Sequence, residues 1–448
     1  MKKILYIFIT FLIVSGCKKS SFMADFDQSP EERMSASIAL VNSTLTSATN
    51  GWNATLSTSA GGGFGFYMNF DNQQNVSMYA DLTDDASIKS VASTYRIKTG
   101  LGADLIFDTY NYISMLADPT STVFGGTQPT GFKSDVEFTY VRSSADSIVF
   151  IGKQYRQLLK MSRATAVQKA TYTAGGYKTA INKVKDYFTA VKYPYIDVTS
   201  GASVLKVGFS LNGTSTLGSG KRATLTGLLE DGVTPASGTG KFAFTLNGAE
   251  FVGSPFVYQG ITFVRLAWKD ASTLALYDVA GKEYVLKSSP TPLTPLNLLF
   301  GFPSTFTYRK ITIPGTGLPA GVTSGFTAVY NAMLNNIIAS KRVVNYTTIT
   351  LTSNSSLQVY VSYNSGTSLF NATADYTYTR TGDVITLGTS PVYSNNWTTR
   401  AAELLPLTNY MLTGPFKIDW VTSTAVSTEV LGGLYRTADA TSFIYGVL

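Results

Sequence analysis

The sequence predicts an α+β fold dominated by β-strands, in which antiparallel meanders or partly closed barrels are each preceded by one amphipathic helix. Three stretches, beginning near residues 29, 175 and 324, place apolar residues three or four positions apart, as one face of a helix requires. Each stretch is followed by roughly a hundred residues in which apolar and polar residues alternate, the pattern of half-buried strands. Aromatic residues make up 13% of the chain, with 27 Tyr and 26 Phe, which favours pleated sheets.

The first predicted helix carries the strongest start signal. Ser29 suits the N-cap, Pro30 suits the first helical position, and Glu32 lies three residues after the cap, where it can complete a capping box. The expected apolar face comprises Met34, Ile38, Val41 and Leu45. Asn50-Gly51 supplies a stop signal, because Gly tolerates the left-handed backbone that often ends a helix.

A β-hairpin is expected directly afterwards. Alternation begins over residues 64–70, the chain turns at residues 71–75, and alternation returns over residues 76–80. The preceding Gly61-Gly62-Gly63 could suggest a phosphate-binding loop, but no Lys-Ser/Thr pair follows and no helix is expected there. We therefore interpret these glycines as a flexible strand junction.

Two further helices and a series of strands complete the expected elements. One helix runs from about Tyr177 to Val191 and is ended by Pro194, and another runs from about Ser324 to Lys341, where basic residues suit the C-terminal helix dipole. The inward face of the latter comprises Phe326, Tyr330, Met333, Leu334, Ile337 and Ile338. Strands are expected at residues 136–140, 148–150, 204–209, 242–246, 261–268, 274–277, 349–351, 357–363, 376–379, 384–387 and 442–448.

The spacing of the three helices suggests three domains. They span residues 29–170, 171–295 and 296–448, after a signal peptide at residues 1–16 and a tether at residues 17–28. The proline-rich segment Pro290–Pro295 is the best internal boundary, because closely spaced prolines interrupt regular structure. A division into two domains at this segment is the alternative.

The first residues predict lipid attachment at Cys17. Two lysines precede an apolar run at residues 4–14, which is too short to span a bilayer and has the layout of a secretory signal. The small residues before Cys17 resemble a bacterial lipobox, so this cysteine is expected to carry the acyl chains after cleavage. We therefore expect a lipid-anchored protein of the outer membrane. Lys18 and Lys19 leave open whether it faces the cell surface or the periplasm.

The composition excludes several kinds of site. The chain has no histidine and one cysteine, which rules out zinc, copper and non-haem iron sites built on His or Cys, and also Ser-His-Asp and Cys-His catalysis. The formal charge of +7 comes from scattered basic residues, whereas nucleic-acid binding needs a concentrated patch. We therefore predict no catalytic residue, no metal site, no cofactor and no nucleic-acid partner.

Carboxylate chemistry remains open, although no motif nominates a pair of acids. Asp81, Asp84 and Asp85 form the densest acidic group, and we interpret them as a solvated loop because the ligand spacing of a calcium loop is missing. Glu230-Asp231 lies beside a glycine and is explained by a turn. A glycosidase needs two acids across a cleft, a separation that sequence spacing does not measure.

Three short stretches bring together aromatic side chains with amides or proline, a combination that can stack on sugar rings. They lie at residues 110–112, 193–195 and 393–397. In a chain this rich in aromatic residues, such stretches are better explained by core packing or strand edges. The sequence therefore assigns no ligand-binding residue.

Several stretches resemble a known family. They are NGWNATL at residues 50–56, GFGFYMNF at residues 63–70, VSMYAD at residues 76–81, LIFDTYNY at residues 105–112, LADP at residues 116–119 and KSDVEF at residues 133–138. Together they resemble the Bacteroides-type lipoproteins grouped as domain of unknown function 4302. The resemblance covers about residues 29–163 and extends more loosely to about residue 277.

This resemblance implies a context and brings no catalytic residues. Members of the family tend to be encoded beside outer-membrane transporters of the starch-utilisation-system type, each a TonB-dependent barrel with a lipoprotein lid, and beside companion lipoproteins. It therefore implies an accessory role in capturing a nutrient, peptide or glycan, with the transporter and the other lipoproteins as partners. The leading hypothesis is a non-enzymatic lipoprotein anchored at Cys17. The alternatives are a carboxylate-dependent hydrolase and a structural cell-surface module.

Overall fold

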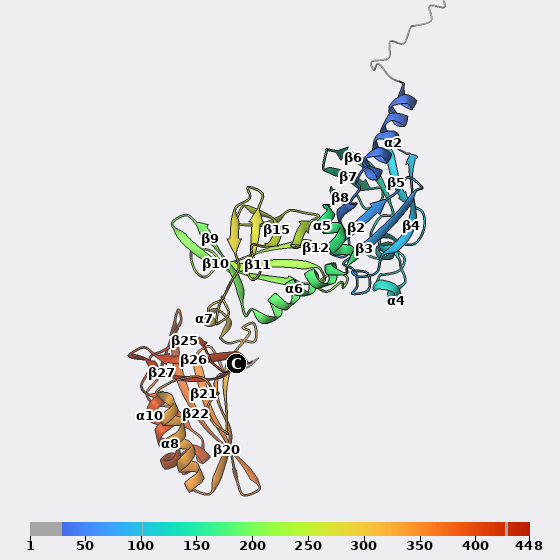
Figure 1. The fold of residues 1–448 in the computed structure, drawn as a ribbon. Coiled ribbons are helices and arrows are strands. Elements are labelled where there is room, and N and C mark those ends of the chain that lie inside the picture. Colours follow the sequence, from blue (N-terminus) through green and yellow to red (C-terminus); the bar gives the residue numbers. More distant parts are fainter. Residues whose placement is uncertain (1–28, 101, 426–428) are drawn as a thin grey trace, which may run out of the picture. The chain divides into compact units, whose positions relative to one another are not determined.

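The computed structural model describes residues 29–448 with the exception of residues 101 and 426–428 (Figure 1). In this part of the chain the strands form three antiparallel sheets, so the predicted α+β, β-dominated class is confirmed. The chain groups into two compact units. The first extends to Ile181 and includes residues 214–221 and 242–246, and the second holds residues 182–213, 222–241 and 247–448.

The first sheet is a closed barrel. Its strands are β1 (Trp52–Ser57), β2 (Gly63–Phe70), β3 (Asn75–Ala80), β4 (Val91–Thr99), β5 (Ala103–Phe107), β6 (Glu137–Ser143), β7 (Ser147–Gly152) and β8 (Leu158–Arg163), with the short helices α3 (Tyr112–Ala117) and α4 (Ser121–Phe124) between β5 and β6. Each strand pairs with the next, and β1 also pairs with β8, so the ring has no free edge. Apolar side chains from every strand fill it, among them the fully buried Phe64, Met68, Phe138 and Phe150.

Helix α2 (Pro30–Thr46) precedes this barrel, and its predicted start is confirmed. The Ser29 hydroxyl accepts the N–H of Glu32 at 3.2 Å, and the Glu32 carboxylate accepts the N–H of Ser29 at 2.9 Å. The helix ends at Thr46, before the predicted stop. Gly51 instead turns the chain into β1 with a φ of 74°. The indole N–H of Trp52 then donates to the Leu45 carbonyl at 3.0 Å and ties the helix to the barrel.

The predicted hairpin is confirmed, because β2 and β3 pair in register from Phe70 opposite Val76. The interpretation of the preceding glycines as flexible is wrong. A Cβ at Gly61 would lie 2.3 Å from the Phe132 ring, and a Cβ at Gly62 would lie 2.1 Å from Cβ of Lys221. Both glycines are buried, and close packing against their neighbours requires that they carry no side chain.

The second sheet follows α5 (Ala166–Thr173) and α6 (Gly176–Ala190), and α6 matches the helix predicted from Tyr177. Its strands are β9 (Pro194–Ser200), β10 (Ser203–Asn212), β11 (Arg222–Leu228), β12 (Pro235–Thr245), β13 (Gly248–Val252), β14 (Phe256–Tyr258), β15 (Ile261–Trp268), β16 (Leu274–Asp278), β17 (Glu283–Val285) and β18 (Lys287–Ser288). The strand order is β17-β16-β15-β13-β12-β11-β10-β9-β18, with β14 beside β15. Because β18 follows β17 after one residue and yet pairs with β9 at the opposite edge, the sheet nearly closes on itself.

The third sheet, which follows the short helix α7 (Leu296–Leu299), is a second closed ring. Its strands are β19 (Lys310–Pro314), β20 (Arg342–Leu351), β21 (Ser356–Ser365), β22 (Ser368–Thr381), β23 (Val384–Leu387), β24 (Val392–Tyr393), β25 (Phe416–Val421), β26 (Leu431–Arg436) and β27 (Asp439–Val447). Strand β19 pairs with both β20 and β27, and β21 pairs with β22, so the pairing runs through the whole ring. Strand β24 pairs with β22 only and stands outside this circuit.

Helix α8 (Phe326–Ala339) corresponds to the third predicted helix and packs against α10 (Ala401–Met411) (Figure 1). Four positions of the predicted inward face are buried: Phe326, Tyr330, Met333 and Ile337. Ile338 is 60% exposed, against the prediction, because it lies about 100° further round the helix than Ile337. The expected interaction of Lys341 with the helix dipole is also wrong, since the last turn holds no basic residue. Helix α10 and the short α9 (Asn395–Thr399) were not predicted.

Each strand predicted from alternation overlaps an observed strand. None of the helices in the described ranges is long and apolar enough to cross a membrane. The predicted signal peptide, the lipid-attachment residue Cys17 and the tether fall outside the described residues.

Candidate functional site

The acidic group at the end of β3 is divided by the fold. Asp84 lies 3.0 Å from Nζ of Lys178, and Asp85 lies 3.0 Å from Nζ of Lys89, both at the surface. Asp81 is buried, so its interpretation as part of a solvated loop is wrong. An ionised carboxylate is stable in such a place only when another charge compensates it.

Lys221 supplies that charge within the first unit. Its Nζ lies 2.5 Å from Oδ2 of Asp81, and both side chains are at most 1% exposed. The backbone N–H of Phe244 donates to the same oxygen at 2.8 Å, whereas Oδ1 has no hydrogen-bond partner among the described residues. Nζ also lies 5.4, 5.6 and 4.4 Å from the ring centroids of Phe64, Phe242 and Phe244. Aromatic rings therefore enclose the pair and keep it from solvent.

Backbone contacts fix the position of Lys221. Its N–H donates to the Thr214 carbonyl at 2.8 Å, and its carbonyl accepts the N–H of Phe242 at 3.2 Å. Its φ of 51° lies in the left-handed region, which a side chain such as lysine seldom adopts. The missing side chain at Gly62 leaves the space that Cβ of Lys221 occupies. The fold thus holds an uncommon lysine conformation against the aspartate.

The second unit contains a cavity of about 510 Å³. Trp420 at the end of β25 and Tyr193 before β9 provide aromatic surface, and Glu429 is the one acidic residue among the described residues of the lining. The other lining residues are Lys192, Pro290, Thr291, Pro292, Pro319, Ala320, Val421, Ser423, Ala425, Val430 and Leu431. The cavity therefore offers rings, prolines and hydroxyl groups with few charges.

Hydrogen bonds hold the aromatic wall of this cavity in place. The indole N–H of Trp420 donates to the Thr294 carbonyl at 2.8 Å, and the Trp420 carbonyl accepts the Tyr435 hydroxyl at 2.9 Å. The Ser423 hydroxyl donates to the Ala320 carbonyl at 2.8 Å and joins two segments of the wall. Burial raises the pKa of Tyr193, so at neutral pH this residue presents an uncharged hydroxyl. The wall is thus formed before any ligand arrives.

A second cavity, of about 340 Å³ in the first unit, holds the acids Asp135 and Glu137. The Asp135 carboxylate accepts the N–H groups of Gln154 and Tyr155 at 2.7 and 3.0 Å. Glu137 and Asp104 each lie 3.0 Å from Nζ of Lys153, and these hydrogen bonds raise the pKa of the lysine. Asp135 therefore holds the loop at residues 154–155, and Glu137 pairs with Lys153.

Residues of two of the three aromatic stretches serve the framework, as predicted, whereas the third stretch contributes a residue to the cavity of the second unit. Asn111 caps α3 by accepting the N–H groups of Ile113 and Ser114 at 2.8 and 3.0 Å. Trp397 is buried in α9, with Tyr393 stacked on it at 5.8 Å between centroids. The third stretch, residues 193–195, leads into β9, and of its residues Tyr193 reaches the cavity of the second unit.

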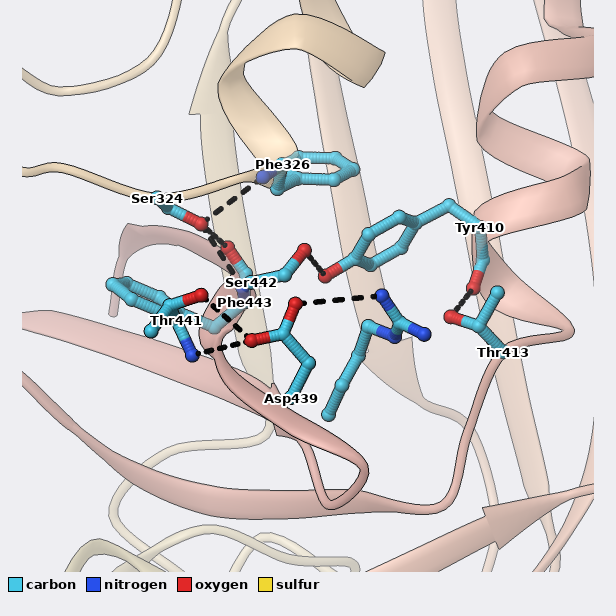
Figure 2. Close-up of polar contacts among 9 residues, drawn as sticks. Ser324, Phe326, Tyr410, Thr413, Asp439, Thr441, Ser442 and Phe443 are labelled. Atoms are coloured by element: carbon cyan, nitrogen blue, oxygen red, sulfur yellow. Dashed lines mark hydrogen bonds and ion pairs between the residues drawn. The ribbon is translucent and has the colours of Figure 1, made fainter.

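A buried polar network joins the start of α8 to β27 (Figure 2). The Ser324 hydroxyl donates to the Phe443 carbonyl at 2.7 Å, and accepts the N–H groups of Phe443 and Phe326 at 2.9 and 3.2 Å. The hydroxyl groups of Tyr410 and Ser442 lie 2.9 Å apart, and burial raises the pKa of Tyr410. Because the Ser324 hydroxyl is fully engaged with the backbone, it braces the fold and is not an activated nucleophile.

Sequence reasoning missed Lys221 and the cavity of the second unit. Lys221 stands in a Gly-Ser-Gly-Lys-Arg run that reads as a surface turn, and its partner is 140 positions away. The cavity lining comes from separate segments near residues 192, 290, 319, 420–425 and 429–431, with no local motif. In the described ranges no group of three or more His, Cys, Asp or Glu residues is placed to hold a metal ion.

The fold and its cavity define a protein of antiparallel β-sheets with a preformed, weakly charged cavity. The family model for the domain of unknown function DUF4302 matches residues 24–270, which is more than half of the chain. The chain belongs to this family, and the resemblance in the N-terminal stretches is confirmed. A comparison with curated proteins found no match.

Proposed function

We propose that the protein is a lipid-anchored accessory lipoprotein of the outer membrane that binds a nutrient ligand, a peptide or a glycan, without converting it. The observation that carries the proposal is the cavity of the second unit. Its volume of about 510 Å³ falls within the range of about 300–1,000 Å³ common for small-molecule sites. The lipobox-like end at Cys17 supports the anchoring part of the proposal.

The chemistry of the lining favours an uncharged ligand with apolar faces and hydroxyl or amide groups. Trp420 and Tyr193 offer rings on which a sugar or a proline-like side chain can stack. Thr291 and Ser423 offer hydroxyl groups at the same cavity. Because Glu429 is the one acid among the described lining residues, this lining presents no pair of carboxylates of the kind that glycoside hydrolysis requires. These features favour binding over turnover.

The ligand is tested with glycan and peptide arrays, followed by thermal unfolding of the full protein with each hit. At a free ligand concentration a hundred times Kd, binding adds about 2.7 kcal/mol to the free energy of unfolding. Ala320→Trp places a large ring in the cavity and is expected to weaken binding at least tenfold. Ala402→Trp, at an exposed position on α10, is the matched control and is expected to leave binding unchanged. Equal binding by both variants would exclude this cavity.

The anchor is tested separately with Cys17→Ala. This variant is expected to lose lipid labelling and to leave the membrane fraction, because two or three acyl chains are what hold a lipoprotein permanently. Unchanged membrane retention would contradict the anchoring proposal. Protease treatment of intact cells then distinguishes the cell surface from the periplasmic face.

A starch-utilisation-system-type TonB-dependent transporter and its companion lipoproteins are the partners we propose. Affinity purification of the anchored protein from solubilised membranes is expected to retain the transporter. If no transporter is retained and no glycan or peptide on the arrays is bound, the proposed accessory role is wrong.

A further inference from the structure

The pair of Lys221 and Asp81 has properties that a buried ion pair does not require. We propose that these two residues form an intramolecular isopeptide bond, an amide between Nζ of Lys221 and Cγ of Asp81, once the first unit has folded. The reacting groups are already in contact, with Nζ 2.5 Å from Oδ2 and neither side chain more than 1% exposed. The inference is independent of the ligand cavity, which lies in the second unit.

Confinement supplies the first requirement of this reaction. The backbone of Lys221 is held by Thr214 and Phe242, and Gly62 packs directly on its Cβ. The Asp81 N–H donates to the Gly65 carbonyl at 3.0 Å, which fixes the other partner. For groups held in this way, effective molarities reach on the order of 10⁵ M or more. An amine and a carboxyl group that react slowly in solution are therefore expected to react much faster when they are held in this way.

The dry surroundings supply the second requirement. Phe64, Phe242 and Phe244 place their rings 4.4–5.6 Å from Nζ, and charged groups are costly in such a place. A proton passing from the ammonium to the carboxylate across the 2.5 Å contact leaves a neutral amine beside a neutral carboxylic acid. The neutral amine is the nucleophile that the reaction needs, and the carboxylic acid is the form from which hydroxyl can leave.

The two oxygens of Asp81 have different surroundings, which suit one to become the amide oxygen and the other to leave. Oδ2 accepts the N–H of Phe244 at 2.8 Å and becomes the amide carbonyl oxygen, since this donor stabilises negative charge on it as Nζ attacks Cγ. Oδ1 has no hydrogen-bond partner among the described residues, and it is the oxygen that departs.

The bonds that form and the bonds that break balance without a co-reactant. The Nζ–Cγ bond forms and the Cγ–Oδ1 bond breaks. Of the three protons of the Lys221 ammonium, one stays on the amide nitrogen and two leave with Oδ1 as water. The proton first passed to Oδ2 moves to Oδ1 in the tetrahedral intermediate, and the second comes directly from Nζ. Nothing is oxidised or reduced, and the ion pair with its buried charges is replaced by one neutral amide.

The test is peptide mapping of the full protein. Trypsin releases Asp81 in the peptide of residues 34–89. It releases Lys221 in the peptide of residues 207–222, because an acylated lysine is not cleaved. The expected result is one species in which these two peptides are joined with the loss of one water molecule, located to Asp81 and Lys221 by fragmentation. Only unlinked peptides from folded protein would overturn the proposal and leave a plain ion pair.

Two variants separate covalent linkage from pairing. Asp81→Asn is expected to give the same linked peptides, because the side-chain amide loses ammonia where the acid loses water. Lys221→Arg keeps the positive charge and is expected to give unlinked peptides only. If Lys221→Arg does not fold, the wild-type protein and Asp81→Asn still decide the question, since absence of the link in both excludes it.

The chain provides an internal control in the same digest. Asp84 and Lys178 also lie 3.0 Å apart, but both side chains are solvent-exposed, at 67% and 36%. No link is expected between them, because these exposed side chains are neither held in place nor shielded from water. A link at this exposed pair would show that proximity alone causes the reaction, and would overturn the reasoning from burial.

Discussion

Replacement of Ser324 by alanine tests whether the third sheet depends on the polar brace shown in Figure 2. Ser324 is 7% exposed, and its hydroxyl serves three backbone groups: the carbonyl and N–H of Phe443 and the N–H of Phe326. The change removes these three hydrogen bonds and introduces no large cavity, since a hydroxyl is small. The change in the free energy of unfolding therefore measures the loss of these hydrogen bonds and not a loss of packing.

The magnitude follows from what the backbone groups lose. Phe326 is the first residue of α8, and the loss of the hydrogen bond from its N–H to the Ser324 hydroxyl costs about 1 kcal/mol. Each buried backbone group of Phe443 left without a partner costs about 1–3 kcal/mol. Together these losses predict that the free energy of unfolding falls by about 3–7 kcal/mol.

Urea unfolding followed by tryptophan fluorescence measures this change, because Trp397 and Trp420 both belong to the core cluster of the third sheet. Ser355→Ala is the control, since Ser355 is exposed and a surface change of this kind alters stability by at most about 0.5 kcal/mol. Hydrogen exchange in β27 should accelerate in Ser324→Ala only. A fall of less than 1 kcal/mol, or one equal to that of the control, would refute the idea that the hydroxyl braces the sheet.

Further outcomes follow from the first unit and from one turn of the third sheet. Gly62→Ala should lower the free energy of unfolding in urea by about 3 kcal/mol or more, because its Cβ would lie 2.1 Å from Cβ of Lys221. Gly366→Ala meets no atom within 4 Å and should lower it by about 1–2 kcal/mol, the cost of placing a side chain on a left-handed backbone. Trp52→Phe should cost about 1–3 kcal/mol, since the Leu45 carbonyl loses its donor; a smaller loss would mean that water replaces the indole. Burial raises the pKa of Tyr95 from 10.0 to about 12. The stabilisation by its neutral hydroxyl is therefore complete below pH 10 and is lost as the pH rises towards 12, which lowers the free energy of unfolding by about 2–3 kcal/mol. Tyr95→Phe should therefore lose stability at pH 7, through the missing bond to the Asp71 carbonyl, and decline less steeply than the wild type above pH 10; equal slopes would contradict this.

Local signals in the sequence were sufficient for many elements. The start of α2 followed from Ser29, Pro30 and Glu32 because a capping box is made by residues three positions apart. The β2–β3 hairpin followed from alternation on both sides of a short turn. Helix α10 was missed because Pro406 lies inside it, and proline normally argues against a helix interior.

Long-range relations could not be predicted in the same way. Ring closure in the first sheet depends on Trp52 pairing opposite Arg163, and no local pattern specifies which strands meet last. Asp81 was assigned to solvent with its neighbours, although a lysine far along the chain compensates it. The cavity was missed for the same reason, since its walls come from distant segments. A pattern reports which face of an element is apolar, but not which element will cover it.

Closure of two of the three sheets also affects whether neighbouring molecules can join through their strand edges. A free strand edge exposes unpaired N–H and carbonyl groups that invite a neighbouring molecule to add a strand and begin polymerisation. The first sheet has no such edge, and the third completes its own circuit through β19. In the second sheet the two-residue strand β18 pairs only with Pro194 and Tyr195 of β9. The first and third sheets therefore offer no free ring edge to a neighbour when molecules are packed densely on a membrane surface, as the proposed anchor implies.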